Sequence, residues 1–471
     1  MAQPRLIMDL DEFRREAHAL ADWAADYLRD VGRERVMSAV EPGQVRGALP
    51  ASPPRAGEPF GRIREDFDRI VYPGLTHWAH PGFFGYFPAN HSPPSILAEF
   101  LVAALGTQGM SWQTSPAATE LEQVVMDWLR QMVGLPDGFV GVIQDYASTS
   151  TLVALITARD RHRDELDRAT VYLSAEAHSS VAKGARLAGY RPELIRPVPT
   201  DASYAMDPGE LARMVAADRG AGLRPSAVVA TLGTTSSTGF DPVPAIGAIA
   251  RTEGLWLHVD AAFAGSAAIV PELRWIMAGI DQADSVVLNP HKWLLVNHDC
   301  SAYFVRDPGA LLRSFSTSPE YLKTKYDASV INYRDWGIPL GRRFRALKLW
   351  FVIRSYGVDG LVAMIREHVR LGHRFAGWVE ADERFELAAP APVGLVCFRL
   401  RARPGESGDS IDDANRRLLD QINAPGDFLL THTVLGGRFT LRLALGHLST
   451  TEALVARLWA RVEQAATAIM R

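Results

Sequence analysis

Three short apolar stretches near the middle of the chain end in residues that can do chemistry. The stretches are 228–232, 256–259 and 285–288. Ligands of open α/β sheets bind outside the carboxyl ends of the strands, so we expect the groups that follow these stretches to meet at one edge of a sheet. They supply hydroxyls, a carboxylate, an amide, an imidazole and an amine: Thr234, Thr235, Asp260, Asn289, His291 and Lys292.

Lys292 and Asp260 both stand in apolar surroundings, where a charge is costly. Residues 286–288 and 293–296 flank Lys292, and this setting favours a neutral, nucleophilic amine of the kind that forms imines with carbonyl groups. A carboxylate at the end of an apolar strand needs a cation or hydrogen-bond donors, and a protonated pyridine nitrogen is one such cation. Plainer alternatives stay open here: a lysine that reaches a surface partner, and an aspartate that caps a helix or forms a buried ion pair.

A helix start rich in hydroxyl groups is the third signal. The apolar stretch 139–143 is followed by Ser148, Thr149 and Ser150 and then by a helical pattern. Free N–H groups at a helix start suit phosphate, although each of these residues could also be an ordinary helix cap. An anion site, a strand-end carboxylate and an apolar lysine about 30 residues later together match the needs of pyridoxal phosphate.

Apolar stretches alternate with helix-length segments through the middle of the chain. This alternation predicts parallel strands joined by crossover helices in a largely buried sheet. The clearest predicted strands are 139–143, 169–173, 227–232, 255–259 and 285–288.

The two ends of the chain show other patterns. Apolar residues at helical spacing predict an amphipathic helix over 9–30, and the stretch 41–60, rich in Pro and Gly, follows it. We therefore expect the first ~60 residues to be an extended arm that packs on a partner surface, with a dimer partner the natural candidate. Beyond about residue 370 the pattern predicts a smaller α+β domain. Its predicted strands are 393–400 and 438–445, and its predicted helices are 412–424 and 451–469.

Composition limits the classes of function. The 471 residues include 50 Lys and Arg against 54 Asp and Glu, a net charge of −4 without blocks of like charge, so we expect no nucleic-acid partner. Cys300 and Cys397 are far apart and lack metal-ligand spacing, so we expect neither a disulfide framework nor a metal site, and we favour a cytoplasmic location. No run of about 18 apolar residues predicts a membrane span, and the first 20 residues lack the pattern of a secretory signal.

Several segments, in order along the chain, resemble the pyridoxal-phosphate-dependent group II decarboxylases, specifically the aromatic L-amino-acid decarboxylases. The segment NPHKWLLVN around Lys292 is the most specific of them, and the likeness covers nearly the whole chain. The segments are THWAHPGFFGYFPAN, SWQTSPAATELE, AHSSVAKGA, ATLGTTSSTGFDPV, HVDAAFAGSA, NPHKWLLVNHDCSA, EYLK and PLGRRFRALKLWF.

The resemblance implies an α/β chain with the type I pyridoxal-phosphate (aspartate aminotransferase-like) fold. This fold has a mostly parallel central sheet, an N-terminal helical arm and a small C-terminal α+β domain, and it acts as an intertwined homodimer. We place the arm, exchanged between subunits, at 1–80, the large cofactor-binding domain at 81–365 and the small domain at 366–471.

The resemblance also implies which residues hold the cofactor. Lys292 would bond to its aldehyde, Asp260 would pair with the pyridine nitrogen, and His178 and Ala262 would cover the two ring faces. The residues implied around the phosphate are Ala147, Ser148, Asn289 and His291. Those implied in the network around the ring are Thr235 and Asp241.

A further set is implied for the substrate. Met110 and Trp112 match positions that approach from the partner subunit, and a mobile loop over about 315–329 carries Tyr321, which would return a proton to the substrate carbon. The implied substrate-binding residues are Trp78, Tyr86, Phe87, Pro88, Met110 and Arg442. Positions that depart from the commonest family pattern are Ala89, Asn90, Met110, Tyr146 and His298. Gly341, which has no side chain, mildly favours a substrate site with enough room for tryptophan.

The resemblance implies decarboxylation of tryptophan, tyrosine, phenylalanine or 3,4-dihydroxyphenylalanine to the arylalkylamine and carbon dioxide. The alternative is an aromatic acetaldehyde synthase, which decarboxylates and oxidatively deaminates, but relatives of that type tend to replace the tyrosine matching Tyr321 or, in insects, the histidine matching His178. A cofactor-binding pseudoenzyme would usually have lost Lys292, Asp260 or Tyr321. A glutamate decarboxylase is disfavoured by the aromatic segment 78–88.

Overall fold

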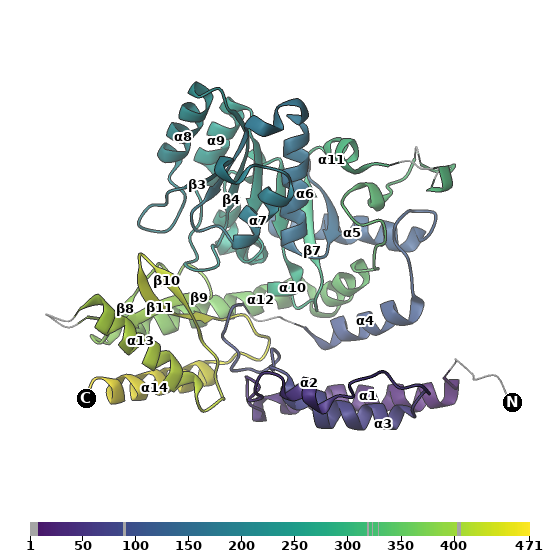
Figure 1. Ribbon diagram of the computed structural model, residues 1–471, viewed down its shortest axis with the longest axis vertical. Helices are drawn as coiled ribbons and strands as arrows, with labels where there is room; N and C mark the ends of the chain where they lie inside the picture. Colours follow the sequence, from purple (N-terminus) through teal and green to yellow (C-terminus); the bar gives the residue numbers. More distant parts are fainter. Residues whose placement is uncertain (1–7, 88–90, 318–319, 323, 328, 403–406) are drawn as a thin grey trace.

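Two sheets joined by one long helix organise the molecule. The computed structural model describes residues 8–87, 91–317, 320–322, 324–327, 329–402 and 407–471 (Figure 1). A seven-stranded sheet fills the upper part of the view, a four-stranded sheet lies at the lower left, and α12 (Ala346–Ala381) runs between them. The predicted α/β class with a mostly parallel central sheet and a small second sheet is confirmed.

The seven-stranded sheet has the order β1-β7-β6-β5-β4-β2-β3, and among its described strands β7 alone runs opposite to the others. Its strands are β1 (Val140–Gln144), β2 (Ala169–Ser174), β3 (Ile195–Val198), β4 (Arg224–Thr231), β5 (Trp256–Asp260), β6 (Ser285–Leu288) and β7 (Ser301–Val305). The five predicted strands all form. β3 and β7 are absent from the prediction because β3 is a four-residue edge strand containing Pro197, and no Gly or Pro marks the start of β7.

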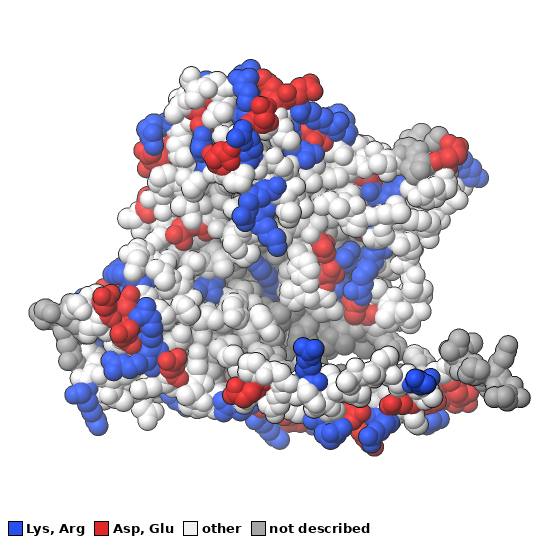
Figure 2. Space-filling view, viewed as in Figure 1, with Lys and Arg blue, Asp and Glu red and all other residues white. Residues whose placement is uncertain are grey.

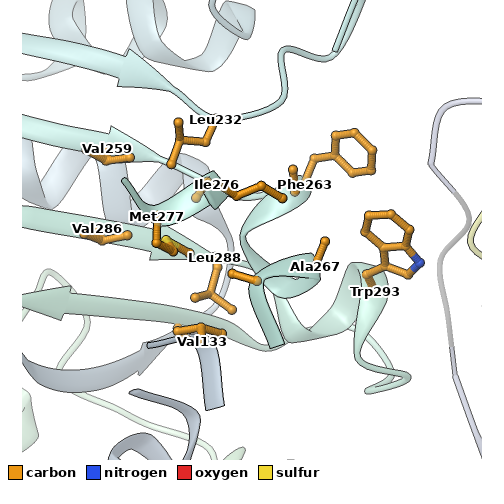
Figure 3. Close-up of a cluster of buried hydrophobic side chains, with 14 of the residues drawn as sticks. Val133, Leu232, Val259, Phe263, Ala267, Ile276, Met277, Val286, Leu288 and Trp293 are labelled. Atoms are coloured by element: carbon orange, nitrogen blue, oxygen red, sulfur yellow. The ribbon is translucent and has the colours of Figure 1, made fainter. Parts of the chain in front are cut away.

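Helices cover both faces of this sheet. Alternate strand residues pack in opposite directions: on β5, Leu257 and Val259 join the cluster under α5, α8 and α9, whereas Trp256 joins the cluster under α6, α7 and α11. Figure 3 shows part of the first cluster, to which Val259, Val286 and Met277 all belong. These helices are α5 (Pro116–Val133), α6 (Ala147–Asp160), α7 (Ser179–Leu187), α8 (Pro208–Gly220), α9 (Val243–Glu253) and α11 (Pro308–Phe315).

The small sheet is antiparallel, with the order β10-β11-β9-β8, and helices α13 (Gly408–Asn423) and α14 (Glu452–Ile469) pack against it. Its strands are β8 (Phe385–Leu387), β9 (Leu395–Leu400), β10 (Thr431–Leu435) and β11 (Arg438–Ala444). The helix α12 bends at Gly357, whose φ is +64°. The predicted domain division at 365/366 falls inside α12, and the division itself stays a prediction.

The N-terminal region is helical and lies along the lower edge of Figure 1. The predicted helix 9–30 forms α1 (Leu10–Asp30), which Asp9 caps by accepting the N–H groups of Asp11 and Glu12. No residue of α1 is buried in the single chain. The other helices here are α2 (Gln44–Ala48), α3 (Phe60–Asp66) and α4 (Pro93–Leu105).

Charges are mixed over the surface. On the face shown in Figure 2, Lys and Arg side chains are interspersed with Asp and Glu. Among the described residues, no helix has the length and apolarity that a membrane crossing needs.

Candidate active site

A cavity of about 220 Å³ lies where β4, β5 and β6 end and α6, α7 and α10 (Pro290–Trp293) begin. Nine of the ten residues that the resemblance implies around the cofactor line it: Ala147, Ser148, His178, Thr235, Asp260, Ala262, Asn289, His291 and Lys292. Asp241 does not, because its buried carboxylate accepts the N–H groups of Met206 and Thr231. The carboxyl ends of the parallel strands meet at this edge, as the sequence predicts.

Lys292 and Asp260 face this cavity from neighbouring strand ends. Burial lowers the pKa of the Lys292 amine, the Asp260 carboxylate acts in the opposite direction, and the Arg442 charge lowers it further. Asp260 is 6% exposed, and its Oδ1 accepts the N–H of Ala262 at 3.0 Å. The neutral, nucleophilic form of Lys292 is therefore easier to reach here than in water.

Hydrogen-bond donors collect at the other end of the cavity. Tyr146 precedes α6 without a side-chain cap, and in the described part of the chain no protein group accepts the N–H of Ala147 or Ser148. Burial keeps the pKa of His291 well below its ordinary value. Because its Nδ1 accepts the N–H of Cys300 at 3.0 Å, the neutral ring carries its proton on Nε2. Asn289 accepts the Ser301 hydroxyl at 2.7 Å, which leaves its amide N–H₂ as a donor. This donor set fits a phosphate group.

Thr231 adds a feature that the sequence analysis does not identify. It lies beside Asp260 in the β4–β5 pair, lines the cavity, and is 4% exposed. Its Oγ1 is buried and has no hydrogen-bond partner among the described residues. A bound molecule with a polar group at this point would satisfy it. With the amine, the carboxylate and the phosphate donors, the cavity fits pyridoxal phosphate.

His178 borders the cavity from the start of α7. Its Nδ1 accepts the N–H of Ser180 at 3.2 Å and lies 2.7 Å from the Ser180 hydroxyl, which fixes the ring. Burial and the nearby Lys292 charge lower its pKa, while Asp260 opposes them. The ring is therefore held mainly in its neutral form.

A second cavity, of about 390 Å³, adjoins the first. The predicted substrate residues Trp78, Tyr86, Phe87 and Arg442 line it, and the rings of Trp78 and Tyr86 stack at 5.6 Å. Pro88, like Ala89 and Asn90, lies outside the described residues. Lining residues that were not predicted to bind substrate include Phe263, His298, Thr431, His432 and Thr433. Thr431, His432 and Thr433 belong to an edge strand of the other sheet, so no local sequence signal pointed to them.

Arg442 ties the walls of this second cavity together. Its Nε donates to the carbonyl of Thr235 at 2.7 Å, and its Nη1 donates to the carbonyl of Tyr86. Burial lowers its pKa to about 10, so the guanidinium remains charged at neutral pH. The cavity therefore contains a fixed positive charge beside aromatic rings.

Tyr321, Met110 and Trp112 lie in neither cavity. Tyr321 is 79% exposed, and the segment that follows α11 extends to the right of Figure 1, away from α10 at the centre. Met110 accepts the N–H of Arg334, and Trp112 packs edge-on against Tyr326 at 4.8 Å. Met110 and Trp112 therefore contact the segment 326–334, and neither they nor Tyr321 line a cavity with Lys292 of the same chain.

Trp293, directly after Lys292, connects the site to the small sheet. Its ring stacks on Phe263 with the ring centroids 5.4 Å apart and meets Phe87 edge-on; Figure 3 draws Phe263 and Trp293 next to each other. The indole N–H donates to His368 Nδ1 at 3.0 Å, so Nε2 of His368 carries a proton and donates to the carbonyl of His447, also at 3.0 Å. His368 comes from α12 and His447 follows β11. The wall of the second cavity is thereby linked to the small sheet.

Comparisons with known proteins identify the family of this chain. Residues 42–401 match the family model described as the pyridoxal-dependent decarboxylase conserved domain. The chain is 42% identical to the aromatic-L-amino-acid decarboxylase of Catharanthus roseus, covering 97% of this chain and 94% of that protein. It is also 42% identical to the phenylacetaldehyde synthase of Arabidopsis thaliana, over 98% of this chain and 97% of that protein. The crystal structure of Oryza sativa TDC with PLP and tryptamine superposes with a TM-score of 0.97, at 40% identity and full coverage of both chains. The predicted type I fold is confirmed.

Proposed function

Since the chain belongs to the pyridoxal-dependent decarboxylase family, we propose that it converts aromatic L-amino acids to arylalkylamines and carbon dioxide. The substrates are tryptophan, tyrosine, phenylalanine or 3,4-dihydroxyphenylalanine. One observation carries the proposal: the cavity with Lys292 and Asp260 continues into a cavity walled by aromatic rings. Five residues line both cavities: His178, Thr235, Phe263, Lys292 and His298.

Pyridoxal phosphate is the cofactor, and when bound its protonated ring accepts the electrons released as the carboxyl group leaves. Lys292 would hold the cofactor through its aldehyde, at the place that the amine of the substrate must reach. Asp260 would keep the pyridine nitrogen protonated, because a buried carboxylate beside it favours the charged form. The donors of α6, Asn289 and His291 would hold the phosphate, and His178 and Ala262 would hold the ring.

The aromatic cavity receives the side chain of the substrate. Trp78, Tyr86 and Phe87 offer ring surfaces, and the charge of Arg442 attracts the substrate carboxylate before it is lost. Tyr321 then returns a proton to the substrate carbon.

Because Tyr321 is exposed and lines neither cavity in one chain, we propose that a homodimer completes each site. The helix α4 exposes Leu97 (61%), Phe100 (52%) and Leu105 (62%), and α1 buries nothing in the single chain, so both offer apolar surface to a second copy. The arm 1–80 packs on the partner subunit. Met110, Trp112 and Tyr321 of each chain serve the cavity of the other.

Mixing two variants that form little or no amine tests this arrangement. In a hybrid of Lys292→Ala and Tyr321→Phe chains, exchange of Tyr321 between subunits leaves one site with both groups intact. We expect amine formation to return when the two purified variants are unfolded, mixed and refolded. A hybrid as inactive as either parent would show that Tyr321 acts within its own chain.

Product analysis tests the reaction itself. Purified protein with pyridoxal phosphate is incubated with tryptophan, tyrosine, phenylalanine, 3,4-dihydroxyphenylalanine and glutamate, and amine, aldehyde, peroxide and carbon dioxide are measured. We expect amine and carbon dioxide in equal amounts from the aromatic substrates and none from glutamate. No product from any aromatic substrate would overturn the proposal.

A second candidate function is favoured by the likeness to the phenylacetaldehyde synthase of Arabidopsis thaliana. That reaction gives aldehyde, ammonia and peroxide in place of amine. Tyr321 and His178 are both present here, which supports the simple decarboxylase. Aldehyde with peroxide in the same incubation would move the assignment to the synthase.

For location we propose the cytoplasm. Cys300 and Cys397 are both free and buried, and neither forms a disulfide. Free thiols persist in a reducing compartment. When the source cells are fractionated, we expect to find the activity in the soluble fraction.

A further inference from the structure

His298 stands at the boundary of the two cavities and lines both of them. Its ring stacks on His291 at 4.4 Å between centroids and lies 5.8 Å from the ring of Tyr146. The other two histidines of the cofactor cavity are oriented by hydrogen bonds, His178 with Ser180 and His291 with Cys300. His298 differs: within the described part of the chain, neither of its ring nitrogens has a protein hydrogen-bond partner.

The surroundings of this ring lower its pKa and so favour its neutral form. Burial lowers the pKa of His298, and the positive charges of Lys348, Lys292 and His91 act in the same direction. The Asp299 carboxylate opposes them. A neutral imidazole has one N–H donor and one acceptor nitrogen. His298 can therefore donate to an oxygen or accept from an O–H or N–H group.

The position of His298 puts these nitrogens beside the path of the substrate. The amino group of a substrate must reach the place of Lys292, and its ring must extend into the aromatic cavity, so the side chain crosses the boundary that His298 borders. Phe87 and Phe263, which line the same cavity, offer only apolar ring surface.

We propose that His298 determines specificity by forming a hydrogen bond with a polar group on the substrate ring. The enzyme then favours rings that carry a hydroxyl or an N–H, as in tyrosine, 3,4-dihydroxyphenylalanine and tryptophan, over the bare phenyl ring of phenylalanine. A site that hydrogen-bonds a substrate hydroxyl rejects the analogue without it, since the polar group of the protein is left unpaired. This proposal rests on the proposed function and narrows its substrate class.

Tyrosine and phenylalanine differ by one hydroxyl, so the ratio of their kcat/KM values is the direct measurement. In the wild type we expect tyrosine to be preferred by at least about tenfold, and in His298→Phe we expect this ratio to fall by about tenfold. His298→Asn keeps a donor and an acceptor and is expected to recover part of the preference. Calorimetry on the holoenzyme with tyramine and phenethylamine gives the same comparison without turnover. Tyramine binding should weaken in His298→Phe while phenethylamine binding is retained.

Two outcomes would overturn the proposal. One is an unchanged preference in His298→Phe with both amines bound as in the wild type. The other is an equal loss on both substrates with weaker retention of pyridoxal phosphate, which would assign His298 to the cofactor. If the wild type forms no product from any aromatic amino acid, the proposed function fails. The amine-binding comparison still decides the role of His298.

Discussion

The two adjoining cavities are built in different ways. Residues that line the cofactor cavity come from 146–298, at strand ends and helix starts of one sheet. The aromatic cavity combines residues 78–87 and 431–442 with parts of that same sheet edge. The first cavity follows from the topology of a single sheet. The second exists only when distant parts of the chain are held together, so it is the more sensitive to changes far from the chemistry.

Close backbone contacts hold the aromatic cavity in place. The N–H of Phe84 donates to the carbonyl of Leu429, and the N–H of Leu429 donates to the carbonyl of Gly82, both at 2.9 Å. Gly82 and Gly446 allow this approach, since a Cβ would lie 2.1 Å from the Asp427 carbonyl oxygen at Gly82 and 2.4 Å from the Phe87 ring at Gly446. The segment with Trp78 and Phe87 is thereby fixed to the small sheet.

Removing the amine of the cofactor cavity is expected to have the largest effect. Lys292→Ala should lower kcat by more than about a thousandfold, because a group that acts with the cofactor as one unit is lost. Borohydride treatment followed by peptide mass analysis should no longer attach the cofactor at position 292. Lys183→Ala, at an exposed lysine on α7, is the matched control and should behave as the wild type. If Lys292→Ala retained activity, although the cofactor is attached at position 292 in the wild type, the role of Lys292 in the reaction would be contradicted.

Tyr321→Phe tests whether a tyrosine that lines neither cavity donates the proton to the substrate carbon. Loss of a positioned proton donor should lower amine formation by about a hundredfold, and the unprotonated intermediate should divert to aldehyde. Folding should be unaffected, because Tyr321 is 79% exposed. Mass spectrometry of products with a peroxide assay makes the measurement. A variant that still forms only amine at the wild-type rate would remove Tyr321 from the reaction.

Gly446→Ala tests whether substrate binding in the aromatic cavity is independent of cofactor binding in the other cavity. The new Cβ displaces the Phe87 ring, and overpacking of this kind costs about 1–3 kcal/mol, so we expect KM for aromatic substrates to rise about tenfold. The affinity for pyridoxal phosphate should stay unchanged, since Phe87 does not line the cofactor cavity. Gly377→Ala, where a Cβ meets nothing within 4 Å, is the control. A parallel loss of cofactor affinity would show that the cavities are not independent.

The cofactor cavity comes from one sheet edge and the aromatic cavity from distant parts of the chain, and this difference explains which site residues the sequence could predict. Asp260 and Lys292 were found because each ends an apolar strand, and parallel strands bring such ends to one edge. The resemblance supplied Trp78, Phe87 and Arg442, which no spacing rule would place together. Thr231 was missed because residue type does not tell which strand-end hydroxyl faces inward. Thr431 and Thr433 depend on how an edge strand of the second sheet meets the first, which is a tertiary property.

The smallest expected effect concerns the junction that joins the aromatic cavity to the small sheet. Burial lowers the pKa of His368 to about 4, while in the unfolded chain a histidine titrates near 6.5. Between these values the unfolded chain binds a proton that the folded chain does not. The contribution of His368 to the free energy of unfolding therefore has its full value above pH 6.5. It decreases as the pH falls toward 4, by about 1.4 kcal/mol per pH unit.

His368→Gln offers one acceptor to Trp293 and one donor to His447 but does not titrate. Between pH 6.5 and 4.5 its free energy of unfolding should fall less steeply with pH than that of the wild type. The difference in slope should correspond to the uptake of about one proton fewer on unfolding. Urea unfolding at a series of pH values measures this difference, and contributions from His258 and His447, whose pKa values burial also lowers to about 4 and about 3, remain in both proteins. His373→Gln, at an exposed histidine of the same helix, is the control. Equal slopes in wild type and His368→Gln would show that His368 is protonated in the folded junction, and the link from Trp293 to the small sheet would then lack its acceptor.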